Sequence, residues 1–328
     1  MITLSEPANV YDVVISQDRC SYCGACITVC PKGALEPAVD EPYFNKDECV
    51  NCKLCLRFCP SQPAEIEPLP VMEAYTGRTL LEDVKEHAQD GGIVSTLLIA
   101  GLEEGLFTAA LTCKADGLKP TPVISTTRKD VVESAGSKYS SSPNLSLLTK
   151  AVSEHEKIAV VGVPCQVKAS RLLQGFGRYR GKIEVIIGIF CMENFKHTIL
   201  VREMLPNLLG VDPGDAGRMQ IKHGRFTVYL KDGVKAEVPV KRLKSYMRGS
   251  CHSCGDLTAL YSDISVGSIG SEEGWSTILV RTEAGKRILE LAASKGMMEL
   301  KSLPEEGAAL LDKLEKAKAK RGLKAGQK

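Results

Sequence analysis

The 328-residue sequence lacks several features that would place it in a specialised class. No apolar run reaches the roughly 18 residues that span a bilayer, and one of the longest, 93–102, contains Ser95 and Thr96. The start of the chain has no basic stretch followed by an apolar one, as a secretory signal requires. Charge of one sign is not in excess, with 42 Lys and Arg against 40 Asp and Glu, so composition argues against nucleic-acid binding. We expect a cytoplasmic protein without a membrane span, peripheral to a membrane only through a partner complex.

Cysteine, by contrast, is abundant: the chain has 13 cysteines, and eight of them lie between Cys20 and Cys59. An odd number cannot form a closed set of disulfides, and disulfides are disfavoured in a reducing compartment. Clustered cysteines in such a protein therefore indicate metal or redox chemistry. No HExxH, Walker or Ser–His–Asp pattern suggests another chemistry.

Two cysteine runs of identical spacing occupy the N-terminal part of the chain. Each reads C-x2-C-x2-C-x3-C-P, and the second begins at Cys49, 29 residues after Cys20. This is the spacing of two-cluster bacterial ferredoxins, in which the fourth cysteine of each run binds the cluster of the other run. Zinc knuckles fit less well, because zinc commonly takes two separated ligand pairs. The runs predict two 4Fe-4S clusters, one on Cys20, Cys23, Cys26 and Cys59 and the other on Cys49, Cys52, Cys55 and Cys30.

A proline-rich connection, 60–70, follows the second run and predicts an extended linker. We therefore expect three parts: a two-cluster ferredoxin domain at 1–68, a large domain at 69–300, and a basic C-terminal helix or tail at 301–328. That last part is predicted either to be solvated or to dock on an acidic partner or membrane surface, with Leu310, Leu311 and Leu314 on one helical face.

Short apolar runs alternate with helical patterns in the large domain, which predicts an α/β fold with a largely parallel sheet. A hairpin around Asp232-Gly233, between 226–231 and 234–240, favours a mixed sheet over a doubly wound one. The whole chain is then α+β, a small ferredoxin domain followed by a mixed-sheet α/β domain. The expected strands are 107–113, 122–126, 158–163 and 183–190, and the expected helices are 91–105, 145–152, 166–173 and 198–209.

Five cysteines lie outside the ferredoxin runs. Cys165 and Cys191 each follow a predicted strand, and Cys251 and Cys254 form a C-x2-C pair. Because the carboxyl ends of parallel strands share one edge of a sheet, these four thiols are predicted to meet there. From spacing alone, either a third 4Fe-4S cluster or a four-cysteine zinc site remains open. Cys113, inside an apolar run, is predicted to be a structural thiol.

Three further segments suit anionic ligands, and each also has an ordinary structural explanation. Gly91 and Gly92 precede a helix and would let a phosphate approach its N-terminus, although Asp-Gly is also common capping chemistry. The segment 136–142 offers hydroxyl, backbone and ammonium donors, or is a solvated loop. A basic group, Lys241, Arg242, Lys244 and Arg248, is either a solvated face or an anion site.

Taken together, the motifs QDGGIVSTLLIAGLEEGL, GSKYSSSPNL, IAVVGVPCQVKA, IGIFCMENF and CHSCGDLTALYSDISVGSIG resemble the coenzyme F-420 hydrogenase/dehydrogenase beta-subunit family over about 75–300. The resemblance implies FAD, hydride exchange with the 8-hydroxy-5-deazaflavin coenzyme, and a 4Fe-4S cluster on Cys165, Cys191, Cys251 and Cys254. It also implies FAD contacts at Gly91, Gly92, Lys138, Tyr139, Ser140 and Ser141. The basic group would anchor the anionic tail of the coenzyme.

The implied activity is that of a reduced-F-420 oxidoreductase in which FAD links hydride transfer to single-electron transfer through three 4Fe-4S clusters. No side chain is assigned as catalytic. The implied partners are complexes of the heterodisulfide reductase, hydrogenase, formate dehydrogenase or membrane dehydrogenase type, in the context of methanogenesis. The alternatives are an electron-transfer adaptor without its own substrate, and a family reductase with a different substrate.

Overall fold

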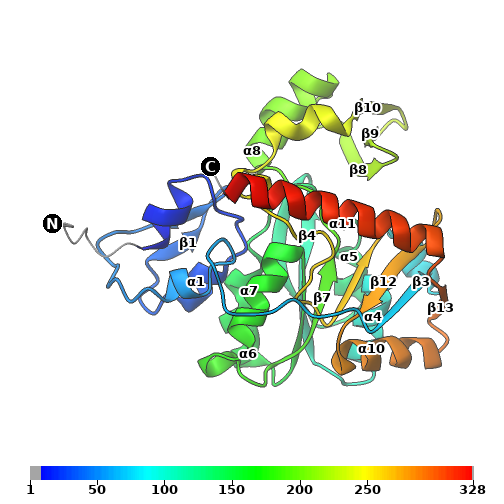
Figure 1. Cartoon of the computed structure of the whole chain (residues 1–328), viewed down its shortest axis with the longest axis horizontal. Helices are drawn as coiled ribbons and strands as arrows, with labels where there is room; N and C mark the ends of the chain where they lie inside the picture. The colour runs from blue at the N-terminus through cyan, green and yellow to red at the C-terminus, as the bar shows by residue number, and fades with distance from the viewer. Residues whose placement is uncertain (1–8, 327–328) are drawn as a thin grey trace.

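The computed structural model describes residues 9–326, and the side chains through Lys324. The N-terminal ferredoxin module packs against one side of a larger α/β domain, and a small lobe lies above that domain (Figure 1). Within the described residues, no helix is both long and apolar enough to cross a membrane. The module contains η1 Tyr11–Ile15, α1 Ala25–Val29, β1 Leu35–Pro37, β2 Pro42–Phe44 and α2 Leu54–Arg57.

The large domain is built on an eight-stranded sheet with the order β13-β3-β12-β11-β7-β6-β4-β5. Its four central strands, β11, β7, β6 and β4, are parallel, and the remaining pairings are antiparallel. The prediction of a mixed sheet is thus confirmed. The strands are β3 Glu73–Thr79, β4 Ala109–Asp116, β5 Lys119–Ser125, β6 Ile158–Gly162, β7 Ile183–Ile189, β11 Ile264–Gly267, β12 Ser276–Val280 and β13 Met298–Ser302.

Helices cover both faces of this sheet, because its central strands are apolar on both sides. On β6, Ala159 and Val161 face one core while Ile158 and Val160 face the other. The first core is closed by α4 and α10 and the second by α6 and α7. The helices of this domain are α3 Glu82–Lys85, α4 Ile93–Glu103, α5 Arg128–Glu133, η2 Asn144–Leu147, α6 Leu148–Glu154, α7 Pro164–Gln174, η3 Gly177–Tyr179, α9 Gly249–His252, α10 Glu283–Ser294 and α11 Glu305–Gly326.

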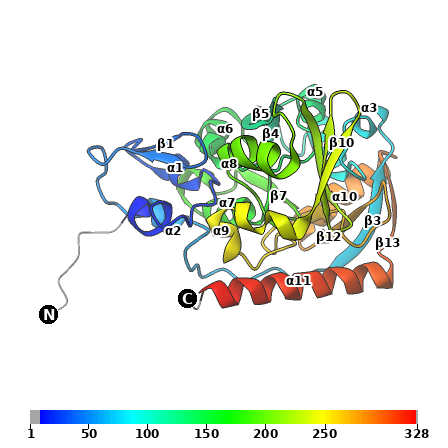
Figure 2. The same ribbon diagram turned by 90° about the horizontal axis from the view of Figure 1, so that it is seen from above.

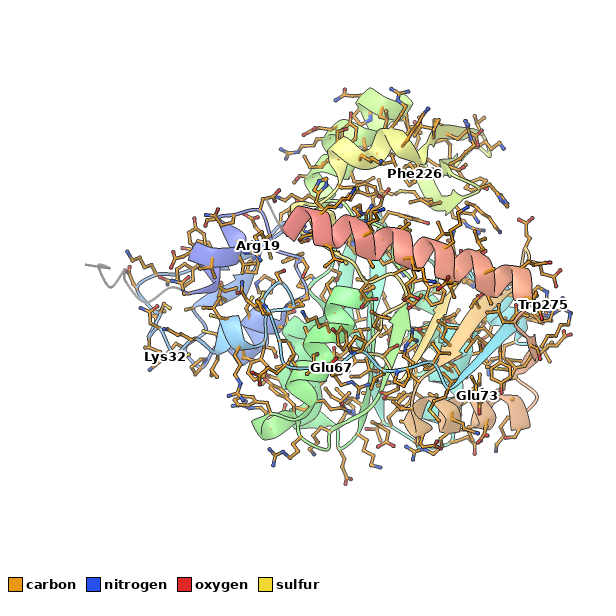
Figure 3. All side chains as sticks on the ribbon, in the orientation of Figure 1. Arg19, Lys32, Glu67, Glu73, Phe226 and Trp275 are labelled. Atoms are coloured by element: carbon orange, nitrogen blue, oxygen red, sulfur yellow. The ribbon has the colours of Figure 1, made fainter. Side chains whose placement is uncertain are left out.

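The small lobe, residues 195–247, has its own core around Phe226 (labelled in Figure 3). The predicted hairpin is present there, with β9 and β10 paired antiparallel and Gly233 in the left-handed conformation of the turn. The predicted helix 198–209 forms mostly as a wider helix with Pro206 inside it. The lobe consists of α8 His197–Ile199, η4 Leu200–Leu208, β8 Ala216–Lys222, β9 Arg225–Leu230, β10 Lys235–Pro239 and η5 Val240–Tyr246.

The C-terminal helix α11 lies lengthwise along the large domain instead of extending into solvent, and its last turns approach α9 (Figure 2). The side chains of Leu311 and Leu314, on the inner face of α11, pack against Leu257 and Leu279 of the large domain. Leu310, predicted to share a helical face with Leu311 and Leu314, is exposed. Leu311 and Leu314 are three residues apart and share a face with Lys318, whereas Leu310 lies outside that stripe.

Candidate functional site

The first thiol set, Cys20, Cys23, Cys26 and Cys59, lies where the ferredoxin module meets the large domain. Burial raises the pKa of the Cys26 thiol well above its usual value, and the neighbouring thiols Cys23, Cys20 and Cys59 raise it further. Cys59 and Cys55 of the second run both act on Cys26, so the exchange of the fourth cysteines stays a prediction from the spacing. The backbone N–H of Tyr22 donates to the Cys20 sulfur over 3.3 Å.

The second thiol set, Cys30, Cys49, Cys52 and Cys55, lines a single cavity together with residues from both runs. Lys32 lines this cavity too and lies at the end of the module remote from the large domain (Figure 3). Cys52 is exposed. The second set is therefore the outer one.

The two runs share an unusual backbone conformation at equivalent positions. Tyr22 and Asn51 are 29 residues apart and have φ values of 56° and 51°, and Gly24 and Lys53, at the same spacing, have 90° and 62°. Left-handed backbone costs about 1 kcal/mol or more at a residue other than glycine. Its retention at three such residues indicates that these turns are shaped for the thiols and not for the stability of the module alone.

The third thiol set, Cys165, Cys191, Cys251 and Cys254, is assembled from three parts of the large domain. Cys165 is in the first turn of α7, Cys191 follows β7, Cys251 lies on α9 and Cys254 lies just beyond it. Burial raises the pKa of the Cys191 thiol, and the thiols Cys251, Cys165 and Cys254 raise it further. The structure thus brings together the four cysteines at the edge where β6 and β7 end.

No three His, Cys, Asp or Glu side chains in the part of the chain that the structure describes converge tightly enough to hold one metal ion. A zinc ion needs its thiolates about 2.3 Å from one point. A 4Fe-4S core instead takes each thiolate on a different iron, so its ligands surround a wider space. All three sets consist of thiols alone, a ligand composition that both 4Fe-4S clusters and four-cysteine zinc sites use.

The first and third thiol sets are neighbours. Burial raises the pKa of the Cys165 thiol. The Cys23 thiol raises it further, by more than any other neighbouring group does. The backbone N–H of Leu145 donates to the carbonyl oxygen of Cys23 over 3.0 Å, which fixes this turn to the large domain. The sets therefore form a series, with the third innermost and the second outermost.

Gly91 and Gly92 are required by packing. A Cβ at Gly91 would lie 2.4 Å from the carbonyl oxygen of Gly77, and the Gly91 N–H already donates to Ser276 Oγ. Gly92 has a φ of 70° and caps α4. Their predicted contact with FAD remains a prediction, now with a structural reason for both glycines.

The predicted segment 138–141 runs beside the small lobe. Lys138 donates its ammonium protons to the carbonyls of Ala135 and Gly136 at 3.0 and 2.9 Å, and to Ser134. Ser140 is buried, and its hydroxyl has no partner within the described residues. The buried Asn144 side-chain oxygen is likewise unpaired there. Sequence reasoning missed Asn144, although it belongs to the quoted motif GSKYSSSPNL.

Tyr139 joins the predicted segments to the third thiol set. Burial raises the pKa of Tyr139 to about 12; the hydrogen bond from Ile221 N–H lowers it, and Asp90 and Cys191 raise it further. The Phe195 N–H donates to the Tyr139 carbonyl oxygen over 3.2 Å, and the Ser141 N–H donates to the Phe195 carbonyl oxygen over 3.3 Å. Because Phe195 is four residues after Cys191, the segment 138–141 lies beside the chain that carries this third-set thiol.

The predicted basic group divides into two. Lys241, Arg242 and Lys244 are exposed on η5, and no ion pair engages them among residues 9–326. Arg248 is only 2% exposed, and its guanidinium donates to the carbonyl oxygens of Cys20, over 3.0 Å, and Asp40. Arg248 therefore fastens the ferredoxin module to the large domain, and its predicted role as a coenzyme anchor is not retained.

The remaining cysteine, Cys113, lies half-buried on β4. Burial raises the pKa of its thiol, and the only full charge that acts on it among the described residues is Lys138. It is thus separate from the three thiol sets.

A two-run cysteine module fused to a mixed α/β domain with further thiols defines the class as iron–sulfur oxidoreductase subunits. A 4Fe-4S binding-domain model matches residues 13–36. Models of the coenzyme F-420 hydrogenase/dehydrogenase beta subunit match residues 74–149 with the N-terminal model and 155–306 with the C-terminal one. The chain belongs to this family and is an F-420-related oxidoreductase subunit with a 4Fe-4S domain.

Individual relatives agree with the family models. A subunit of the F(420)H(2) dehydrogenase from Methanosarcina mazei is 35% identical over 321 residues, covering 94% of this chain and 91% of its own. The beta subunit of coenzyme F-420 hydrogenase from Methanococcus voltae is 39% identical over 253 residues, covering 74% of this chain and 89% of its own. A chain of the F-420-reducing NiFe hydrogenase complex from Methanosarcina barkeri superposes with a TM-score of 0.74 at 34% identity, covering 78% of this chain and 91% of that chain.

Proposed function

We propose that this chain is an FAD-dependent subunit that exchanges hydride with coenzyme F-420 and passes single electrons through three 4Fe-4S clusters to or from a partner complex. The observation that carries the proposal is a set of backbone hydrogen bonds. They link Tyr139 and Ser141 to Phe195, four residues after Cys191, and Leu145 to Cys23. The predicted flavin segment 138–141 therefore lies beside the chain that carries Cys191, close to the first thiol set, which supports stepwise transfer.

Among the described residues, unpaired polar atoms lie in the predicted FAD segment 138–141 and at the nearby Asn144, which is not among the predicted contacts. The hydroxyl of Ser140 and the side-chain oxygen of Asn144 are buried without partners in residues 9–326. Leaving such atoms unpaired costs about 1 to 3 kcal/mol each, which a bound polar ligand would offset. When bound, FAD supplies conversion between two-electron hydride chemistry and single-electron transfer. The chain's own contribution would be to shield this place from water, which the burial of Ser140 and the partial burial of Tyr139 support.

Three exposed cations form the proposed anchor for the anionic coenzyme. One short helix carries all three: Lys241, Arg242 and Lys244. Burial raises the pKa of the Glu193 carboxyl, and Lys244 is near enough to lower it again. Glu193 follows Cys191 by two residues, so the anchor lies close to the third thiol set. If the double substitution Arg242→Ala and Lys244→Ala leaves the KM for the coenzyme unchanged at low salt, the anchor is elsewhere.

Iron and flavin analysis of the purified chain tests the proposal. We expect about 12 iron atoms, from three cubanes, and one FAD. Adding reduced coenzyme should bleach the flavin absorbance and then the iron–sulfur absorbance. An iron-only spectrum would favour the adaptor without its own substrate. About eight irons together with bound zinc would remove the third cluster.

The relatives suggest where the electrons go. The Methanosarcina mazei relative is a subunit of F(420)H(2) dehydrogenase, and the Methanosarcina barkeri chain belongs to a hydrogenase complex. We propose that a redox complex of this kind docks on the outer, second thiol set, where Cys52 is exposed. Tyr43 and Val50 are exposed apolar residues of the ferredoxin module. If the proposal is right, the double variant Tyr43→Ala and Val50→Ala should recover less of the partner complex in a pull-down than the unaltered protein does.

A further inference from the structure

The C-terminal helix α11 is held in a fixed register over the third thiol set. Two pairs of glycines allow the backbones to touch. A Cβ at Gly322 would lie 2.8 Å from the backbone nitrogen of Gly255, and one at Gly307 would lie 2.0 Å from the carbonyl oxygen of Gly270. Gly255 directly follows Cys254, so the end of the helix presses on the loop that carries two of the four thiols. The model of the family's C-terminal part ends at residue 306 and does not include this helix.

One lysine of this basic helix points inward. Lys318 is 3% exposed and donates to the carbonyl oxygen of Cys191 and, over 2.7 Å, to that of Asp256. No carboxylate lies within ion-pair distance of its ammonium group in the described part of the chain. The other lysines of the helix with described side chains are exposed, namely Lys313, Lys316, Lys320 and Lys324.

Burial of an ammonium group without a counter-charge is costly, and two neutral carbonyls do not neutralise it. The ammonium is held at the backbone of the third thiol set by its hydrogen bond to the carbonyl oxygen of Cys191, and at Asp256, two residues after Cys254. The carboxyl groups of Glu193 and Asp256, each two residues from one of the thiols, also lie near it. Four thiolates on a cluster would add further negative charge at the same place.

The neighbouring turns of α11 bind the two chain segments on either side of the same site. In the segment after β7, the carbonyl oxygen of Met192, next to Cys191, accepts from Arg321 over 2.9 Å. In the loop after α9, the Thr258 hydroxyl donates to Glu315 over 2.6 Å. The helix thus fixes the segment after β7 and the loop after α9 relative to one another. These two segments carry two of the four thiols, Cys191 and Cys254.

We propose that α11 is the cover of the third cluster and that Lys318 is a positioning residue that favours the reduced state of that cluster. The inference rests on the third cluster of the proposed function. A 4Fe-4S core with four thiolates carries a net charge of about −2 when oxidised, and reduction makes it more negative. A fixed ammonium hydrogen-bonded to the backbone of the ligand Cys191 stabilises the more negative state, and net charge is one of the properties that set the reduction potential.

The test is a redox titration of the whole purified protein, followed by electron paramagnetic resonance, with iron counted in each sample. The signal of the third cluster is the one missing from Cys165→Ala. The variants are Lys318→Met, which removes the charge at similar size, and Lys318→Arg, which keeps it. Lys320→Met, at an exposed position of the same helix, is the matched control.

In Lys318→Met with full iron, we expect the ratio of reduced to oxidised third cluster at a fixed potential to fall about tenfold, equivalent to about 59 mV for one electron. The two ferredoxin clusters should be unchanged, and Lys318→Arg and Lys320→Met should titrate like the unaltered protein. Loss of the third cluster from Lys318→Met but not from Lys318→Arg would also support a requirement for charge.

An unchanged ratio in iron-replete Lys318→Met overturns the inference, as does loss of the cluster from both Lys318 variants. A different result addresses the proposed function itself. If the unaltered protein holds only about eight irons, the third cluster is absent before any variant is compared.

Discussion

The second and third thiol sets are the outermost and innermost of the three sets and are built in opposite ways. The second set comes from 26 residues of chain, Cys30 to Cys55, and includes an exposed thiol. The third spans Cys165 to Cys254, is enclosed by the sheet edge, the small lobe and α11, and faces a buried ammonium. The local set suits exchange with another protein, whereas the enclosed set suits exchange with a bound cofactor from which water is excluded.

The largest expected effects separate these two sets directly. Cys165→Ala and Cys52→Ala should each lose about four of the 12 irons, since each removes a ligand of one cubane. With Cys165→Ala, reduced coenzyme should still bleach the flavin while the ferredoxin clusters stay oxidised. With Cys52→Ala, the first and third clusters should still be reduced. Stopped-flow absorbance and iron analysis measure both, and a block of all clusters in Cys52→Ala contradicts the proposed order.

Arg248 connects the two domains that carry these sets, so its removal should weaken the connection without affecting coenzyme binding. Arg248→Met leaves the carbonyl oxygens of Cys20 and Asp40 unpaired, at about 1 to 3 kcal/mol for each group. We expect a lower urea midpoint and slower reduction of the first cluster. Lys244→Ala is the comparison, because it should raise the KM for the coenzyme and leave stability unchanged. A raised KM in Arg248→Met would restore that residue as an anchor.

A smaller effect is expected from crowding the same junction. A Cβ at Gly249 would lie 2.0 Å from the carbonyl oxygen of Asp18 in the ferredoxin module. Gly249→Ala should therefore destabilise the protein by about 1 to 3 kcal/mol and loosen the docking of the module. Limited proteolysis of the linker and urea unfolding report this. Gly175→Ala, at a position with open space, should change neither, and equal effects would mean that the junction is not tightly packed.

The smallest effect concerns Tyr139, near the enclosed set. Its pKa is raised to about 12, chiefly by burial, so folding favours the protonated phenol. The stability that this provides is complete below pH about 10 and is lost as the pH rises toward 12. Between pH 8 and 10.5, unfolding free energy should fall by about 1 kcal/mol more in the unaltered protein than in Tyr139→Phe. Tyr229→Phe, at a more exposed site, should keep the full loss, and identical slopes in all three proteins would refute this burial effect.

Sequence reasoning was most informative where the chemistry is local. The repeat from Cys20 to Cys59 identifies both ferredoxin ligand sets, because the spacing itself encodes the exchange of the fourth cysteines. The apolar runs identify the central strands, since strands buried on both faces are apolar throughout. For the third set, spacing left zinc open, because the meeting of Cys165 with Cys251 depends on how the sheet folds.

The residues that sequence reasoning misplaced or missed are distinguished by burial, which composition does not show. Arg248 lies in a basic stretch with Lys241, Arg242 and Lys244, yet the Arg248 side chain is buried. Lys318 is one of several lysines in a basic helix, and only the docking of α11 distinguishes it from Lys320. Both residues are used by elements more than 100 residues away in sequence, so no local pattern marks them.

The position of α11 has a consequence for how the protein is made. The ferredoxin cysteines and their turns are synthesised first, and domains generally fold in that order during synthesis, at about 5 to 20 residues per second. The cover of the third set comes after every cysteine in the chain. The inner site is therefore complete only once α11 has been synthesised and has docked. If the third set holds a cluster as proposed, its iron and sulfide are inserted later than those of the outer module or are enclosed by the helix afterwards.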